Sequence, residues 1–296
     1  MLNTSLPNPP GAFAATQHDA GPMTVSTLGG VLGARVGGIS LAEPLTPSDA
    51  TRIKAAFAEH SMLLFDDQDL TPDHLIAFGN CFGEIEDERF IPKLEGHPGV
   101  HVLKGISGGK LTTQNLIWHV DHSYKERPLM MAALYALDVP TTGGDTLFAN
   151  MAAAYEALSG RMKAYLEGLS AVHDVASYGL SSGLFDSVEA RSAVGRMPPA
   201  VTHPLVVRHP VSNRKTLFVN QSWTTRILGL DPAESRAILD YLFAHATRPE
   251  FQYRLKWRNR TLCAWDNLAL QHRGIPDYSG PRLMYRVSVA GTWRPS

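Results

Sequence analysis

Short, evenly spaced strand-like segments dominate the chain after residue 130. Turn-forming Gly, Pro, Asn and Asp residues separate these segments, which cover 131–139, 146–150, 203–210, 216–221, 251–257, 261–266 and 283–291. A series of short strands of this kind packs face to face as a sandwich or closes into a barrel. No glycine-rich phosphate loop follows a strand and no internal repeat is visible, so a Rossmann fold finds no support. The pattern predicts a mainly β fold, sandwich or barrel, with helices packed outside it.

The remaining regular segments are two strand regions and several helices. Residues 25–36 and 62–65 are aliphatic and β-branched runs bounded by Gly, Asp and Pro, which is typical of strands. Apolar residues at helical spacing predict helices at 46–61, 71–83 and 232–246, each opening with a proline near its start. Residues 150–169 predict a helix pair interrupted at Ser159 and Gly160.

The length of 296 residues and the 44% hydrophobic content suffice for one large domain with a substantial core. We expect a single domain at 23–296 after a flexible tail at 1–22, which is rich in Pro, Gly, Asn and Ala. Residues 177–199 carry many Gly and Ser and little periodicity. A loop of that length is a lid over a site or a disordered segment, and the sequence leaves both open.

Charge and cysteine content exclude several classes of partner. With 27 basic and 28 acidic residues, no long-range field favours nucleic acid or an acidic membrane face. No apolar run reaches the roughly 18 to 20 residues that a membrane span needs. The chain start lacks the pattern of a secretory signal, and two distant cysteines, Cys81 and Cys263, make no disulfide framework. We therefore expect a cytoplasmic protein.

The segment IWHVDHSY, residues 117–124, places two imidazoles and a carboxylate close together. His119 and Asp121 are two residues apart and can point the same way from a strand or its end. Two neutral imidazoles and one carboxylate on one face of a divalent ion leave positions open for a bidentate co-substrate and oxygen. Taken alone, an H-x-D pair is more often a hydrogen-bonded turn. The best third ligand is His272, where an apolar strand runs into a polar turn.

Arg282 and Arg286 stand four residues apart in a strand-like run and should share a face. Two guanidiniums at one cavity repel each other unless anions lie between them, and the guanidinium fork suits a carboxylate. Their proximity to His272 indicates a dicarboxylate ligand. The alternative is a pair of arginines on a solvated strand face.

Four segments together resemble a known family. They are WHVDHSY, GGDTLFANMAAAYEAL, HPLVVRHPVSNRKTLFVNQSWTTRI and WDNLALQHRGIPDYSGPRLMYR. They are similar, in this order, to the taurine and chlorophenoxyacetate dioxygenases, which are non-haem iron oxygenases that use 2-oxoglutarate. The similarity runs from Val25 to Trp293. It implies a double-stranded β-helix, the jelly-roll of cupins, with flanking helices.

The resemblance also implies residue roles. His119, Asp121 and His272 match the iron ligands. Thr146 matches the threonine that binds the distal carboxylate of 2-oxoglutarate, although a threonine after a Gly-Gly turn is common in itself. Arg282 matches the arginine that pairs with that carboxylate, and Arg286 the one near the metal-bound carboxylate and the acidic end of the substrate.

Two positions are candidates for substrate contact. Asn115 falls where relatives place a polar residue in the substrate pocket. Lys93 offers a positive charge in a segment that lacks the His and Tyr of the taurine enzyme, so taurine is doubtful and an aryloxyalkanoate fits better. The competing interpretation of Lys93 is a solvated loop lysine, which is the commoner case.

Other residues near these motifs are expected to be structural. Strand alternation would turn His122 away from the ligand face, behind the ligands or toward the surface, and Trp118 would pack around the metal. Cys263 is expected to fill an apolar strand. The remaining histidines without a partner at ligand spacing are expected at the core edge or the surface; they are His97, His101, His173, His203 and His209.

The expected activity is hydroxylation of a small organic acid, with oxidative decarboxylation of 2-oxoglutarate to succinate and carbon dioxide. The acid would be a carboxylate such as an aryloxyalkanoate, or a sulfonate or sulfate ester. One alternative is a cupin-like hydrolase or isomerase with another metal at the same three ligands, and another is a binding protein on a jelly-roll. Relatives often form dimers or tetramers, so the resemblance implies a homo-oligomer.

Overall fold

The computed structural model describes residues 22–88, 91–105, 116–176 and 197–296. Its largest element is an eight-stranded mixed sheet in the order β1-β2-β3-β14-β6-β16-β5-β4. The strands are β1 (Thr24–Thr27), β2 (Ala34–Gly37), β3 (Met62–Phe65), β4 (Lys93–Leu94), β5 (His97–Gly105), β6 (Met131–Asp138), β14 (Leu262–Asp266) and β16 (Arg282–Val289). Only the β2–β3 pair is parallel among the described pairings of this sheet.

A second sheet faces this one and completes the sandwich. It has the order β13-β7-β15, from β7 (Thr146–Asn150), β13 (Gln252–Leu255) and β15 (Leu270–Gly274). Smaller sheets join β8 (Ser170–His173), β9 (Val201–Pro204) and β12 (Thr224–Ile227), and β10 (Val206–Arg208) with β11 (Lys215–Leu217). The predicted mainly β fold with a jelly-roll core is confirmed.

The central strands of the large sheet are apolar along their whole length because both faces are covered. In β3, Met62 and Leu64 face the second sheet, while Leu63 and Phe65 face the helices. Successive side chains of a strand point to opposite faces, so a run of four apolar residues serves two separate cores. The inner core lies between the sheets, and its largest fully buried side chains are Trp265 and Phe148.

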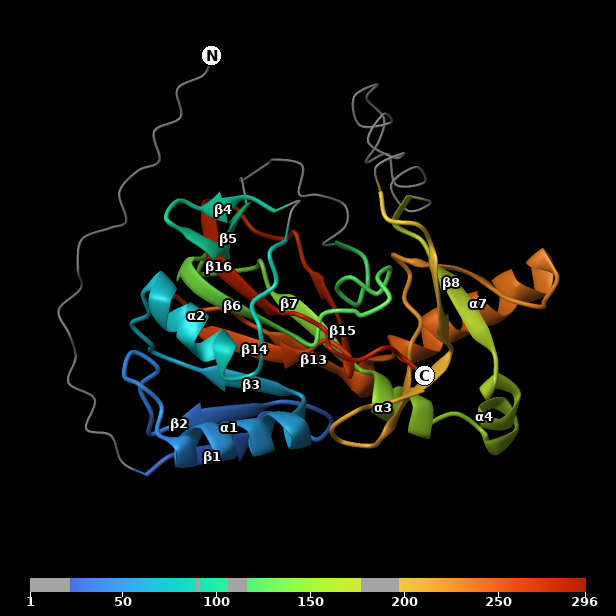
Figure 1. Ribbon diagram of the computed structural model, residues 1–296, viewed down its shortest axis with the longest axis horizontal. Coiled ribbons are helices and arrows are strands. Elements are labelled where there is room, and N and C mark those ends of the chain that lie inside the picture. Colours follow the sequence, from blue (N-terminus) through green and yellow to red (C-terminus); the bar gives the residue numbers. More distant parts are fainter. Residues whose placement is uncertain (1–21, 89–90, 106–115, 177–196) are drawn as a thin grey trace, which may run out of the picture.

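Helices α1 (Pro47–His60) and α2 (Pro72–Asn80) cover the outer face of the large sheet, as Figure 1 shows. Thr46 caps α1 by accepting the N–H of Asp49, and a proline follows each N-cap, where no intrahelical donor is lost. Ile53, Phe57 and Phe78 then bury their side chains against the sheet.

The other helices of the described residues lie toward the opposite end of the molecule, where Figure 1 labels α3, α4 and α7. They are α3 (Met151–Glu156), α4 (Gly160–Leu166), α7 (Pro232–Ala246) and the short η2 (Pro249–Phe251). The predicted helix pair interrupted at Ser159 and Gly160 is found, with Ser159 capping α4. No described helix could cross a membrane.

Several sequence expectations differ from the structure. The strand predicted at 203–210 is broken at Leu205 into β9 and β10, and the one at 216–221 ends at Leu217. Strands β5, β8 and β12 were not predicted, because polar residues such as His97 and Arg226 interrupt their apolar pattern. The predicted tail lies almost wholly outside the described residues, as does most of the possible lid at 177–199.

Candidate active site

The backbones that carry His119 and His272 are joined directly. His272 donates its N–H to the carbonyl of His119 at 3.0 Å, and His119 donates to the carbonyl of His272 at 3.1 Å. His272 lies in β15, opposite Phe148 of β7. The expectation that His272 lies in a turn is therefore wrong, because the turn ends at Ala269 and the chain re-enters a strand before the histidine. The strand pairing fixes the position of both imidazoles.

Asp121 lies in a turn that a single asparagine holds. Asn267 accepts the N–H of Asp121 at 2.8 Å and donates to the carbonyls of Asp121 at 2.8 Å and of Leu129 at 2.9 Å. Trp223 donates its indole N–H to the carbonyl of Val120 at 3.0 Å. The carboxylate of Asp121 is thus placed by side chains from distant parts of the chain.

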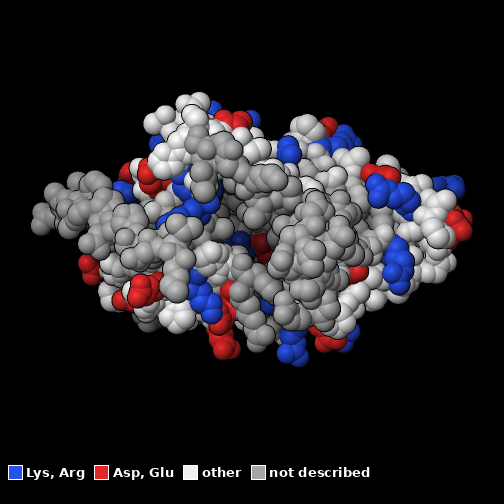
Figure 2. Space-filling model, turned by 90° about the horizontal axis from the view of Figure 1, so that it is seen from above, with Lys and Arg blue, Asp and Glu red and all other residues white. Residues whose placement is uncertain are grey.

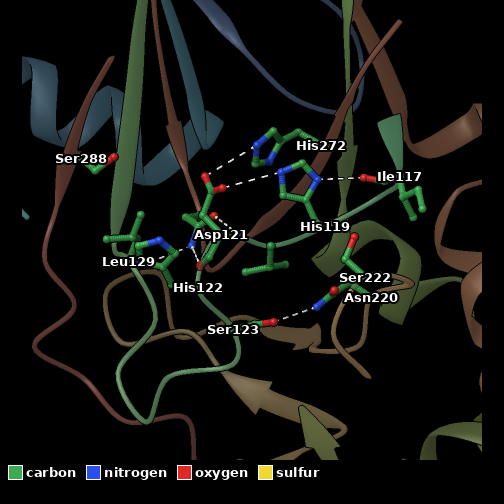
Figure 3. A network of polar contacts seen from close by, with 12 residues as sticks. Ile117, His119, Asp121, His122, Ser123, Leu129, Asn220, Ser222, His272 and Ser288 are labelled. Atoms are coloured by element: carbon green, nitrogen blue, oxygen red, sulfur yellow. Dashed lines mark hydrogen bonds and ion pairs between the residues drawn. The ribbon is translucent and has the colours of Figure 1, made fainter. Parts of the chain in front are cut away.

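His119, Asp121 and His272 converge on one point (Figure 3). Nε2 of His119 lies 3.6 Å from Oδ1 of Asp121, and Nε2 of His272 lies 3.6 Å from Oδ2. One ligand atom from each residue falls within 4.8 Å of the others. Nδ1 of His119 is 2.8 Å from the carbonyl of Ile117, so Nδ1 carries the proton and Nε2 offers its lone pair. A lone pair directed at a carboxylate is stable only with a cation between them.

The protonation states fit the same conclusion. Burial lowers the pKa of His272 to about 3 and also lowers the pKa of His119, so both imidazoles are neutral. Burial opposes ionisation of Asp121, but the positive charge of the Arg286 guanidinium outweighs it, and the pKa of Asp121 falls to about 2. Two neutral imidazoles and an ionised carboxylate are the donor set that a divalent first-row metal binds. The residues therefore fit a metal ion.

A pocket beside the three ligands is lined by three further predicted residues, Thr146, Arg282 and Arg286. Thr146 opens β7, and its hydroxyl oxygen accepts the indole N–H of Trp257 at 3.0 Å, so its own hydrogen is free to donate. Arg282 opens β16 and pairs with no carboxylate among the described residues. Burial lowers the pKa of Arg282. The hydroxyl of Tyr278, in the same pocket, is buried without a hydrogen-bond partner in the described part of the chain.

Arg286 lines the same pocket but is already bound by two carboxylates. Its Nη2 donates to Oδ2 of Asp121 at 2.9 Å, and its Nε donates to Oε1 of Glu88 at 2.8 Å. Glu88 also accepts the hydroxyl of Ser288 at 2.6 Å, and its Oε2 lies 3.1 Å from Nε2 of His122. Figure 2 shows basic and acidic atoms side by side in a hollow near the middle of the face it displays. The two arginines of β16 do share a face, as expected.

The other predicted positions lie elsewhere. Lys93 is partly exposed and pairs with Asp87 at 2.6 Å, and it does not line the pocket. Asn115 lies outside the described residues. His122 is not on a strand, because residues 121–124 form a turn in which His122 has a left-handed backbone with φ 55°. Its imidazole contacts Glu88 rather than the ligands.

Sequence reasoning missed four residues of this site: Glu88, Trp257, Asn267 and Tyr278. Glu88 is one of three acidic residues in EDE and carries no local mark that distinguishes it. Tyr278 stands four residues before Arg282, which is the one signal that could have indicated it. Asn267 directly follows a predicted strand, where a side-chain amide commonly caps a turn.

Comparisons with known proteins agree with this geometry. Residues 24–288 match the model of the "Taurine catabolism dioxygenase TauD, TfdA family". A relative from Cupriavidus pinatubonensis, an alpha-ketoglutarate-dependent 2,4-dichlorophenoxyacetate dioxygenase, is 36% identical over 85% of this chain and 92% of its own length. An alpha-ketoglutarate-dependent sulfate ester dioxygenase from Pseudomonas putida is 29% identical over 95% of this chain and 93% of its own.

Solved structures give the same result. The crystal structure of AAD-2 in complex with Mn(II) and N-oxalylglycine superposes with a TM-score of 0.79 at 33% identity, and the match covers 93% of this chain and 99% of AAD-2. That structure holds manganese(II) and N-oxalylglycine on the same fold. The relatives share both the architecture and the co-substrate class that the pocket predicts.

Proposed function

Because the chain belongs to the TauD/TfdA family of dioxygenases, we propose that His119, Asp121 and His272 hold the iron(II) of a 2-oxoglutarate-dependent dioxygenase. The observation that carries the proposal is the convergence of two neutral imidazoles and one carboxylate within 4.8 Å. Iron(II) with 2-oxoglutarate and oxygen supplies the oxidant that hydroxylates a C–H bond, with succinate and carbon dioxide as the other products.

The pocket residues bind the co-substrate in this proposal. Arg282, which lacks an acidic partner among the described residues, pairs with the distal carboxylate. Thr146 and Tyr278 donate their hydroxyls to the same group. Arg286 donates to Asp121 and therefore lies near the position of the carboxylate bound at the metal. Trp265 and Leu134 line the pocket and exclude water from the reacting groups.

The substrate is a small organic molecule, and the acids used by the named relatives are the first to test. The sequence predicts a carboxylate, sulfonate or sulfate ester whose acidic end meets Arg286 and Lys93, with Asn115 in the pocket. These substrate contacts remain predictions.

The test is an assay of purified protein with iron(II), ascorbate and labelled 2-oxoglutarate. We expect release of carbon dioxide and formation of succinate, stimulated by a suitable substrate. His119→Ala and Asp121→Ala should reduce both to background and should lower iron binding in metal analysis. His97→Ala is the matched control, because His97 contacts Asp73 away from the site. A wild type that binds iron yet leaves 2-oxoglutarate unchanged across the substrate panel would contradict the proposal.

No observation on this chain favours the hydrolase or isomerase alternative. The two reactions differ in their need for oxygen. A dioxygenase is silent under anaerobic conditions, whereas a hydrolase or isomerase at the same ligands keeps its activity there. The anaerobic arm of the assay therefore separates them.

We also propose a homo-oligomer, dimer or tetramer, that works in the cytoplasm. Membership of the family supports the oligomer. The cytoplasmic location is supported by the two free cysteines, since Cys81 and Cys263 form no disulfide. Light scattering after size-exclusion chromatography measures the assembly. A monomer at micromolar concentration would contradict the first part.

A further inference from the structure

The guanidinium of Arg286 is embedded between acidic groups rather than presented as a free cation. Arg286 is 6% exposed and Glu88 is 3% exposed, so their contact is shielded from water. Nε of Arg286 donates to Glu88, which also accepts from Ser288 and contacts His122. Burial opposes ionisation of Glu88, but Arg286 and His122 hold its pKa well below the usual range. Glu88 is therefore a fixed negative charge beside Arg286.

The second cation offered to a substrate, Lys93, is exposed and does not line the pocket. Lys93 lies 2.6 Å from Asp87, on the same stretch of chain as Glu88. Arg282 differs, since no described carboxylate pairs with it. The described part of the site thus leaves one arginine for an incoming anion, and the co-substrate takes that one.

The charges of the loaded site then cancel before a substrate arrives. Iron(II) balances the two carboxylates of 2-oxoglutarate, and the two arginines balance Asp121 and Glu88. The imidazoles of His119 and His272 are neutral when they bind a metal ion. An acidic substrate would add one uncompensated negative charge to a buried pocket, which is strongly unfavourable.

We infer that Glu88 cancels the charge of Arg286, so that the substrate presents an uncharged polar group, such as an amide, ester, ether or hydroxyl, to this side of the iron. This inference rests on the proposed function. Arg286 lines the pocket, and its Nη1 donates to none of the described residues. That nitrogen can donate to a neutral carbonyl or ether oxygen without any transfer of net charge. Glu88 is a specificity-determining residue that acts through Arg286.

The experiment compares acids with their amides on the same skeletons. The pairs are phenoxyacetate with phenoxyacetamide, hexanoate with hexanamide, and ethanesulfonate with ethanesulfonamide. Each is titrated calorimetrically into full-length protein loaded with manganese(II) and N-oxalylglycine, which cannot turn over. Binding of N-oxalylglycine to the manganese-loaded protein is measured first. Its absence would count against the proposed function, whereas the acid-to-amide preference tests only the present inference.

The wild type should bind the amide at least about tenfold more tightly than the acid in each pair that binds, as expected for one unpaired buried charge. Glu88→Gln should shift that preference at least about tenfold toward the acid. Glu86→Gln is the control, because this substitution removes the same charge two residues away, at a carboxylate that pairs with Lys125 and not with Arg286. Wild-type protein that prefers acids, a preference unchanged by Glu88→Gln, or a failure of every neutral compound to bind would each overturn the inference.

Discussion

Two arginines on one face of β16 meet opposite surroundings. Arg282 opens the strand in a pocket with two hydroxyl groups and no described carboxylate. Arg286 lies four residues further along the strand and is bound by Asp121 and Glu88. A cation without a partner in a partly buried pocket is costly, and an incoming anion removes that cost. A cation already paired gains little from another anion. In our proposal, Arg282 therefore binds an anion in the co-substrate half of the site, which also contains Thr146 and Tyr278. Arg286 serves the substrate half, which also contains Glu88, as a hydrogen-bond donor whose charge is already balanced.

The largest expected effect is a loss of 2-oxoglutarate binding. Arg282→Met keeps most of the apolar stem but removes the charge that, in our proposal, receives the distal carboxylate of 2-oxoglutarate. Loss of a hydrogen-bonded charge contact costs about 3 kcal/mol, which corresponds to a roughly 100-fold increase in the KM for 2-oxoglutarate. Steady-state kinetics with varied 2-oxoglutarate measures it. Arg236→Met serves as control, since Arg236 forms an exposed pair with Asp240 on α7. An unchanged KM would show that Arg282 is not the receptor.

The second prediction concerns the ion pair of the substrate half and its pH dependence. The pKa of Glu88 is lowered in the folded protein from the ordinary value of 4.5. Such a group stabilises the fold above its unfolded pKa, and the stabilisation is lost as the pH falls below about 5 toward the folded pKa. Glu88→Gln should therefore lower the free energy of unfolding by about 2 kcal/mol at pH 7, somewhat less than a fully broken buried pair because the amide still accepts hydrogen bonds.

Urea denaturation of metal-free wild type and variant at pH 7, 5 and 4 provides the measurement. The difference between them should shrink as the pH falls, because the unfolded wild type takes up a proton that the folded one refuses. Glu86→Gln should change the free energy of unfolding by no more than about 1 kcal/mol, as partly exposed pairs do. A Glu88→Gln difference that grows toward low pH would contradict the charge assignment.

The sequence indicated which residues gather at the candidate site far better than which of their charges are paired. His119, Asp121, Thr146, Arg282 and Arg286 stand in local motifs, and their residue types state their chemistry. Glu88 is different, because it pairs with Arg286, which is 198 positions away, and its neighbours in the sequence do not indicate this contact. Whether a cation is free or paired depends on such long-range contacts, and a single sequence does not display them.

The fold also has elements that the sequence predicts and elements that it does not. Strands β3, β6 and β14 were predictable because continuous apolar runs mark strands that are covered on both faces. Helices α1 and α7 were predictable from their caps, which are local. The polar strands β5 and β12 were missed, since their pattern follows from neighbours distant in sequence. His272 was assigned to a turn for the same reason: its strand exists through pairing with β7.

The smallest expected effect sharpens the comparison within the co-substrate half. Thr146 accepts the indole N–H of Trp257 at 3.0 Å, which orients its own hydrogen toward the pocket. Thr146→Val keeps the shape but removes one hydrogen bond to a carboxylate, worth about 1.4 kcal/mol, so the KM for 2-oxoglutarate should rise about tenfold. Thr146→Ser should restore most of the affinity, because serine keeps the hydroxyl. If valine and serine raised the KM equally, the loss would come from packing around Trp257, and the hydroxyl would have no part in binding the diacid.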